Sequence, residues 1–275
     1  MASAGELRAA LLALALSGAG GLVKLYGGAR SGSLAVLADG VTCVANLAAG
    51  AAVLVALRIA SAPADEDHPF GHRRYQYTGL LAVLIAYSAA LGFNIALLLL
   101  ASTGRTVEAG GALYALVGGA LYGGSVLYAR RAGVAGRGLS MFTMSEVLES
   151  ALSAGGALGG ALVSPLLDTA GAAVITGYIV VELVGEARDL NRVLVDWAHP
   201  RVYREVYRLL SERGLRVIKL RVRLLEHGRY HGDAVVAPER GMPRDVAELL
   251  LDEAIEEARR LGVDLVATIA PERRG

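Results

Sequence analysis

Over its first two thirds, the chain alternates long apolar stretches with short polar loops. A helix needs about 20 mostly apolar residues to cross a bilayer. The stretches that reach this length are apolar on most of their helical faces, whereas the helices of a soluble bundle keep one polar face. The pattern therefore predicts an α-helical membrane protein with six transmembrane helices, at residues 7–26, 33–60, 78–102, 109–128, 140–164 and 165–185.

The pattern changes after residue 196, where charged side chains become frequent. Periodicity predicts a helix, two strands, a second helix and a third strand, at residues 200–213, 215–225, 230–236, 243–261 and 263–270. This order predicts a small α+β domain with its helices on one face of a sheet. We therefore divide the chain into a six-helix transmembrane domain, 1–196, and a cytoplasmic α+β dimerisation domain, 197–275.

The first predicted strand alternates between apolar and basic residues. Since side chains along a strand point to opposite faces in turn, Ile218 and Leu220 are expected on the face opposite Val217 and Lys219. The basic face is expected in solvent. A small domain with one helix-covered sheet also tends to dimerise, which favours a homodimer.

Lys and Arg near helix ends indicate the orientation of a membrane protein, because the side richer in them is cytoplasmic. Arg58, Arg73 and Arg74 lie on one side, and Lys24 and Arg105 mark the other. The side richer in Lys and Arg is expected to be cytoplasmic, and an even number of spans places both termini on that same side. We therefore expect a multi-pass protein of the cell membrane with both termini in the cytoplasm.

Composition narrows the function classes. The formal net charge is +1, so the chain has no strong attraction for nucleic acid. The single cysteine, Cys43, lies within an apolar stretch and rules out a disulfide framework. The sequence shows neither a nucleophile paired with a base nor a phosphate-binding loop, so we expect no enzyme and no organic cofactor.

A compact acidic and histidine-bearing loop, P-A-D-E-D-H-P-F-G-H, separates the second and third apolar stretches. Asp65, His68 and His72 supply the oxygen and nitrogen donors that bind Zn²⁺ and similar ions, so they are candidates for a peripheral metal site. The alternative is a loop that only joins two helices, with Pro69 and Gly71 shaping a turn.

Together with S-G-S-L-A-V-L-A-D-G at residues 31–40 and the six-span plan, this loop resembles the cation diffusion facilitator family. The resemblance implies a homodimeric exporter of divalent metal ions, often driven by proton antiport, with a ferredoxin-like cytoplasmic domain that joins the protomers. Arg74 matches a basic position of the family that takes part in a charge interlock between protomers. The alternative is that Arg74 only anchors the cytoplasmic side.

The resemblance also implies a transport site, built in the family from paired His and Asp residues on the second and fifth helices. A spacing of four places each pair on one helix face. The matching positions here are Thr42 and Asn46, then Glu149 and Ser153. Three neutral oxygen donors and one carboxylate thus replace the family's charged set. A thiol is absent unless Cys43 turns inward.

Asp39 adds a second carboxylate to these positions, because it lies on the same helical stripe as Thr42 and Asn46. Asp39 and Glu149 are candidates for a two-carboxylate transport site, with Thr42, Asn46 and Ser153 adding neutral oxygens. Such a site suits Mn²⁺ or Mg²⁺ better than Zn²⁺. The alternative is that the carboxylates make interhelical hydrogen bonds and that the hydroxyls bond to backbone.

The leading hypothesis is a secondary transporter that exports a divalent cation (Zn²⁺, Mn²⁺, Fe²⁺ or another) from the cytoplasm by proton antiport. Its partners are the lipid bilayer, a second copy of the chain, the metal and protons, with no nucleic acid. The second hypothesis is a transport-deficient relative that acts as a metal-binding or regulatory membrane subunit. The loss of all but one carboxylate at the four matched positions motivates it.

Overall fold

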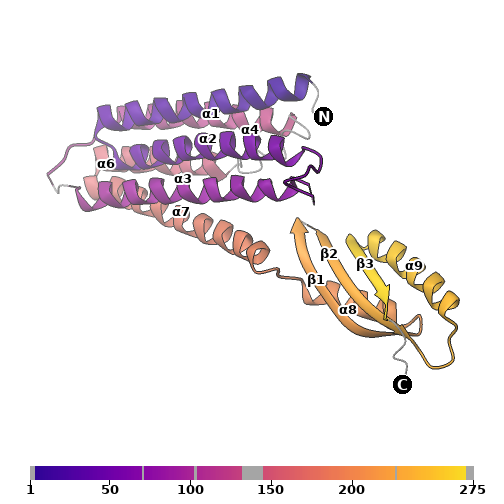
Figure 1. Cartoon of the computed structure of the whole chain (residues 1–275). Helices are drawn as coiled ribbons and strands as arrows, with labels where there is room; N and C mark the ends of the chain where they lie inside the picture. Colours follow the sequence, from indigo (N-terminus) through magenta and orange to yellow (C-terminus); the bar gives the residue numbers. More distant parts are fainter. Residues whose placement is uncertain (1–3, 70, 102–103, 132–144, 227, 271–275) are drawn as a thin grey trace. The chain divides into compact units, whose positions relative to one another are not determined.

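The computed structural model describes residues 4–69, 71–101, 104–131, 145–226 and 228–270, and its backbone forms two compact units (Figure 1). The first unit covers Met1–Ala187 and the second Arg188–Gly275. In the described residues, the first unit contains helices and no strand, and the second combines helices with a small sheet. The predicted class, a helical membrane protein with a C-terminal α+β region, is confirmed at this level.

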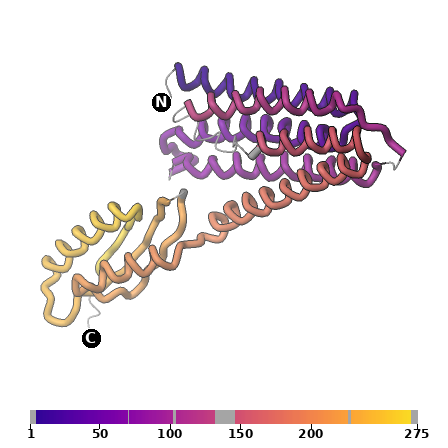
Figure 2. The backbone as a smooth tube through the Cα atoms, turned by 180° about the vertical axis from the view of Figure 1, so that it is seen from behind, coloured from indigo at the N-terminus to yellow at the C-terminus, as the bar shows by residue number. Residues whose placement is uncertain are grey.

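Four long helices form the first part of the helical unit: α1 (Ala4–Ser31), α2 (Leu34–Ala60), α3 (Gln76–Leu99) and α4 (Gly110–Arg131). Figures 1 and 2 show α1 beside α2 and α4, and α2 beside α3. Glycines allow the close approach of α1 and α4. A Cβ added to Gly20 would lie 2.8 Å from the carbonyl oxygen of Gly118, so only a bare backbone fits there.

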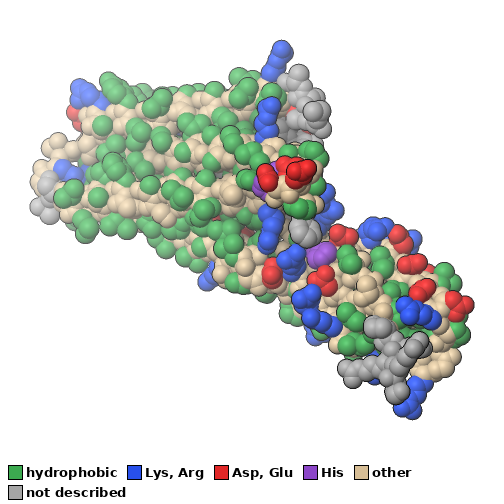
Figure 3. All heavy atoms as spheres, viewed as in Figure 1, with side chains coloured by type: hydrophobic (Ala, Val, Ile, Leu, Met, Phe, Trp, Pro, Cys, Tyr) green, Lys and Arg blue, Asp and Glu red, His purple; other side chains and the backbone are tan. Residues whose placement is uncertain are grey.

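The described part of this unit also contains α6 (Ser145–Leu162) and most of α7 (Pro165–Leu194). Five of the described helical segments are long and apolar enough to cross a membrane, and they correspond to five of the predicted spans. The remaining predicted span corresponds to α6, but residues 140–144 at its start lie outside the described residues. Apolar side chains cover much of the helical surface seen in Figure 3, as lipid contact requires.

A buried ion pair fixes the N-terminus of α2. Asp168, at the start of α7, lies 2.8 Å from Arg105 and accepts hydrogen bonds from the Ser33 hydroxyl at 2.5 Å and the Leu34 N–H at 2.8 Å. Ser33 is also the N-cap, since its side chain accepts the Val36 N–H. These contacts tie the S-G-S-L-A-V-L-A-D-G segment to α7 and so fix the direction in which α2 enters the helical unit.

The second unit contains α8 (Pro200–Ser211), β1 (Leu215–Glu226), β2 (Arg229–Pro238), α9 (Arg244–Arg260) and β3 (Val263–Ile269), in the predicted order. The sheet order is β1-β2-β3, with β1 and β2 antiparallel and β2 and β3 parallel. One core joins both helices to the sheet, with Leu210 of α8, Val236 of β2 and Ala254 of α9 fully buried. Both helices therefore cover the same face.

The strand β1 departs from simple alternation. A β-bulge lies between Val217, which pairs with Val236, and Lys219, which pairs with Val235. Val217 and Leu220 pack against the core, whereas Ile218 is 54% exposed. The expectation that Ile218 and Leu220 share a face is therefore wrong, because the extra residue of a bulge shifts the side-chain pattern by one position.

Candidate cation sites

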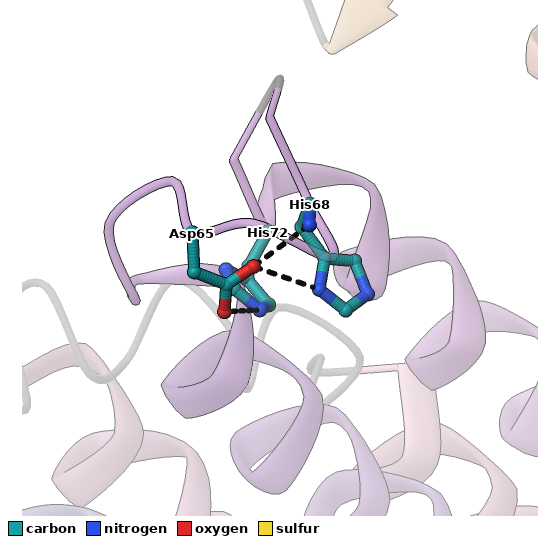
Figure 4. Close-up of side chains that lie close together, drawn as sticks. All are labelled: Asp65, His68 and His72. Carbon is teal, nitrogen blue, oxygen red and sulfur yellow. Dashed lines mark hydrogen bonds and ion pairs between the residues drawn. The ribbon is translucent and has the colours of Figure 1, made fainter.

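Among the described residues, two groups of three ligand-type side chains have ligand atoms within 4.8 Å of one another. The first is the loop group of Asp65, His68 and His72, and Figure 4 shows these side chains converging. Asp65 Oδ1 lies 3.2 Å from His68 Nδ1, and Asp65 Oδ2 lies 3.4 Å from His72 Nε2. Two ligands of a tetrahedral Zn²⁺ lie about 3.3 Å apart, so these separations fit a shared ion.

The loop backbone and a neighbouring helix orient the two imidazoles. His72 Nδ1 lies 2.9 Å from the carbonyl oxygen of Pro63. Because a carbonyl oxygen only accepts, the neutral ring carries its proton on Nδ1 and presents the Nε2 lone pair toward Asp65, as metal-binding histidines commonly do. His68 Nε2 lies 3.2 Å from the hydroxyl of Tyr75. The His72 and Tyr75 rings are stacked with centroids 5.6 Å apart.

The Asp65 carboxylate is held in its charged form. The backbone N–H of His68 donates to Asp65 Oδ1 at 2.7 Å and is the main reason that the pKa of Asp65 lies below its ordinary value. A hydrogen bond from His68 and, when the rings are protonated, the charges of His68 and His72 act in the same direction on the pKa of Asp65, and partial desolvation opposes them. A lowered pKa keeps the carboxylate ionised over a wider pH range, so that it is available as a ligand for a cation.

The predicted interlock residue, Arg74, lies on the short helix η1 (Arg73–Tyr75) that follows the loop, and its side chain is exposed. An exposed guanidinium at this position suits either contact with a second protomer or a membrane-side anchor. The interlock stays a prediction.

The second group lies inside the helical unit and is organised by a buried lysine. Lys24 of α1 donates hydrogen bonds to Asp39 Oδ1 at 2.7 Å, to Ser150 Oγ at 2.7 Å and to Cys43 Sγ at 3.2 Å. The side chains of Lys24 and Asp39 are both fully buried. The other oxygen of Asp39 accepts the Ser153 hydroxyl at 2.7 Å. All three donors of the ammonium are thus satisfied.

The buried side chains around Lys24, which we call the polar centre, are joined by further polar side chains along α2. Asn46 donates to Glu146 Oε1 at 2.5 Å and accepts the hydroxyl of Tyr87 at 2.6 Å, which brings α3 into the site. Asn46 and Glu146 are both buried. The pairs Asp39–Ser153 and Asn46–Glu146 therefore show α2 and α6 facing each other over at least two turns.

The structure places the five predicted transport residues in different roles. It brings Asp39, Asn46 and Ser153 into the polar centre by the contacts above. Thr42 is buried there too, but its hydroxyl donates to the backbone carbonyl of Ala38 at 3.0 Å. Glu149 is buried and stands outside the close group of Asp39, Cys43 and Glu146.

The acidic side chains of the centre are under-partnered. Within the described part of the chain, both carboxylate oxygens of Glu149 and Oε2 of Glu146 are buried without a hydrogen-bond partner. A buried carboxylate without a partner is costly, so these residues are candidates for binding a proton or a cation.

Sequence reasoning missed several members of this centre. It used Lys24 as a marker of one membrane side, but Lys24 lies seven positions before the end of α1 and is fully buried. Tyr87 and Ser150 carried no signal because single hydroxyls are common in membrane helices. The useful signal was a lone Lys and a lone Asp on adjacent apolar helices, since such charges pair inside a membrane.

These features define a class, the multi-pass helical membrane proteins with ionisable groups buried between their helices. The chain belongs to the family defined by the cation efflux transmembrane domain, which matches residues 10–195. The resemblance to the cation diffusion facilitators is thereby confirmed.

Curated relatives match shorter segments. The chain is 39% identical over 74 residues to the uncharacterized transporter sll1263 of Synechocystis, 26% of this chain and 24% of that protein. It is 44% identical over 64 residues to the manganese efflux system protein MneS of Bacillus subtilis, 23% of this chain and 21% of that protein. It is 34% identical over 96 residues to the metal cation efflux system protein CzcD of Cupriavidus metallidurans, 35% of this chain and 29% of that protein. The alignments thus span less than a third of each of these three relatives.

Proposed function

We propose that the protein is a membrane transporter, not an enzyme, that exports a divalent metal cation through the polar centre between α1, α2 and α6. One observation carries the proposal. Three buried carboxylates, Asp39, Glu146 and Glu149, lie at this centre with one buried ammonium, Lys24. Ionised, they leave an excess of two negative charges, which one divalent cation neutralises.

The donor atoms favour a transition-metal ion. The ligand atoms of Asp39, Cys43 and Glu146 lie within 4.8 Å of one another, so the thiol does turn inward. Sulfur ligands are disfavoured by Mg²⁺ and accepted by softer ions, whereas carboxylates suit Mn²⁺. We therefore propose Mn²⁺ or Zn²⁺ as the exported ion and no longer Mg²⁺. The names of MneS and CzcD, a manganese and a metal cation efflux protein, agree with this choice.

The same charge count supports the proposal of proton antiport. Two protons neutralise the excess charge of the three carboxylates as well as one divalent cation does. A site that binds a metal ion on one side of the membrane and protons on the other side exchanges one metal ion for two protons. Transporters that rock around a fixed central site work in this way.

The loop group of Asp65, His68 and His72 is proposed as a peripheral metal site, separate from the transport centre. Three protein ligands leave one position of a tetrahedral Zn²⁺ open for water or another ligand. The charged state of Asp65 and the imposed tautomer of His72 support this assignment.

The remaining architecture is proposed from the family. Six helices cross the cell membrane, with α6 among them and both termini in the cytoplasm. Residues 197–275 form a ferredoxin-like domain that joins two protomers, and Arg74 takes part in a charge interlock between them. The predicted boundary at residue 196 lies near the division between the two units at Ala187 and Arg188.

Reconstituted vesicles test the transport proposal. Uptake of Zn²⁺, Mn²⁺, Fe²⁺, Co²⁺ and Mg²⁺ is measured with and without an imposed pH gradient. We expect Mn²⁺ or Zn²⁺ flux that the gradient accelerates, with little Mg²⁺ flux. The absence of flux for all five ions would overturn the proposal.

One observation favours a second candidate, a metal-binding or regulatory membrane subunit without transport. Both oxygens of Asp39 already have partners, Lys24 and Ser153, so the centre is internally neutralised on that side. Such a protein would bind metal at the loop and carry no flux. Zn²⁺ titration of the purified protein with and without His72→Ala, alongside the flux panel, separates the two candidates.

A further inference from the structure

Lys24 occupies the space that a cation bound to α2 would need. Its Nζ lies 2.7 Å from Asp39 Oδ1 and 3.2 Å from Cys43 Sγ. A metal ion bound to the same two atoms would lie about 2.1 Å from the oxygen and about 2.3 Å from the sulfur. The ammonium and the metal therefore cannot hold these two atoms together.

The fold accommodates the lysine side chain specifically. A Cβ added to Gly118 of α4 would lie 2.5 Å from Lys24 Cγ and 2.8 Å from Lys24 Cε, so the absence of a side chain at Gly118 makes room for the lysine stem. The Ser150 hydroxyl donates to the Glu146 carbonyl at 2.8 Å, which leaves its oxygen free to accept from Lys24. Residues of α2, α4 and α6 thus hold the ammonium in place.

We propose that Lys24 is a tethered cation that competes with the exported metal ion for Asp39. With the site empty of metal, the ammonium holds Asp39 and Cys43. When a metal ion binds, the flexible four-carbon stem withdraws the ammonium. When the metal leaves, the ammonium returns and prevents the ion from rebinding. Lys24 thereby sets the affinity of the site. The inference rests on the proposed transport function for its last step, and its first step concerns binding alone.

Binding of Mn²⁺ to the purified full-length protein tests the first step. The background carries Asp65→Ala, His68→Ala and His72→Ala, so that the loop group contributes no binding. In this background, Lys24→Met removes the ammonium and leaves the Asp39 charge unpaired. The Mn²⁺ dissociation constant from equilibrium dialysis should fall by about tenfold or more, equivalent to about 1.4 kcal/mol.

Two further variants serve as a control for the loss of charge and as a second substitution of Lys24. Arg30→Met removes a positive charge from the exposed end of the same helix, 3.7 Å from Glu108, and should change the dissociation constant by less than about twofold. Lys24→Gln retains a hydrogen-bond donor for Asp39 without the charge and should tighten binding in the same direction. It decides the question if Lys24→Met does not fold.

The transport readout separates competition from a structural role. In vesicles, replacing Lys24 should lower the KM for Mn²⁺ and also lower kcat, because no cation displaces the ion on release. Folded Lys24 variants with unchanged or weaker Mn²⁺ binding would overturn the inference, as would the absence of Mn²⁺ binding at this site both with Lys24 and with its substitutions. Tightened binding without flux in the unmodified protein would overturn the proposed transport function and support the competition. Flux without tightening would overturn the competition alone.

Discussion

Asp168 is predicted to be a main determinant of the stability of the helical unit, because its contacts join the start of α7 to the start of α2. Its carboxylate is fully buried and accepts the Ser33 hydroxyl and the Leu34 N–H, and it lies 2.8 Å from the Arg105 guanidinium. The substitution Asp168→Ala removes all of these contacts at once. It leaves the first turn of α2 without its acceptor and Arg105 without its counter-charge.

The magnitude follows from the contacts that remain. Removing one partner of a buried ion pair costs about 3–5 kcal/mol. Arg105 still donates to the carbonyls of Gly32 and Pro165 and to the Thr169 hydroxyl, each at 2.8 Å, so its charge remains solvated by the protein. We therefore expect the lower end, a loss of about 3 kcal/mol in the free energy of unfolding.

The matched control is Asp189→Ala on α7. Asp189 pairs with Arg192 at 3.0 Å, but both side chains are more than half exposed. An exposed pair of this kind contributes about 0.5 kcal/mol or less. Unfolding in mixed detergent micelles, followed by the helical circular dichroism signal, gives both free energies. Equal stabilities of the two variants would refute the role assigned to Asp168.

Three further predictions concern the loop, the centre and the helix packing. Because the pKa of Asp65 is lowered in the folded loop, the stability that its carboxylate contributes is present above the ordinary Asp pKa of about 3.9 and is lost as the pH falls below that value. The His68 amide resonance in NMR spectra reports this loss, and a loss near about pH 5 would contradict the prediction. Glu146→Gln should reduce Mn²⁺ flux by about tenfold or more, whereas Glu253→Gln on the exposed face of α9 should leave it within about twofold. Gly119→Ala places a Cβ 2.6 Å from the Ser150 Cβ and should destabilise the protein by about 1–3 kcal/mol. In the control Gly155→Ala, the added Cβ meets no atom within 4 Å and should leave the stability unchanged. Equal unfolding midpoints of the two variants in detergent micelles would argue against this packing.

The apolar pattern was sufficient to predict the helical elements and the tail order, because burial in lipid or in a small core requires regular hydrophobic spacing. The loop group was also accessible from the sequence. Asp65, His68 and His72 lie within eight residues of one another, so a single local turn brings their ligand atoms together. The bulge at Ile218 was missed, although the adjacent apolar pair Val217-Ile218 interrupts the alternation of the strand at the position where the register shifts.

The polar centre could be predicted only in part. Asn46 and Ser153 were assigned from the family resemblance, and Asp39 from its helical spacing to Thr42 and Asn46. Such spacing fixes positions on one helix but not the rotation of its neighbours. The partner of Asn46 proved to be Glu146, one turn before the predicted Glu149. The role of Lys24 depends on the distance between two helices, and that distance is set by glycine contacts that only the packed structure reveals.

The central claim is that buried carboxylates carry a divalent cation across the membrane, and Mn²⁺ uptake by vesicles tests it most directly. The unmodified protein is compared with Asp39→Asn and Glu149→Ala at equal protein density and with an imposed pH gradient. The account predicts Mn²⁺ flux in the unmodified protein and a decrease of about tenfold or more in each variant. Absence of Mn²⁺ flux together with absence of Zn²⁺ flux in the same vesicles, or Mn²⁺ flux that neither substitution changes, would contradict it.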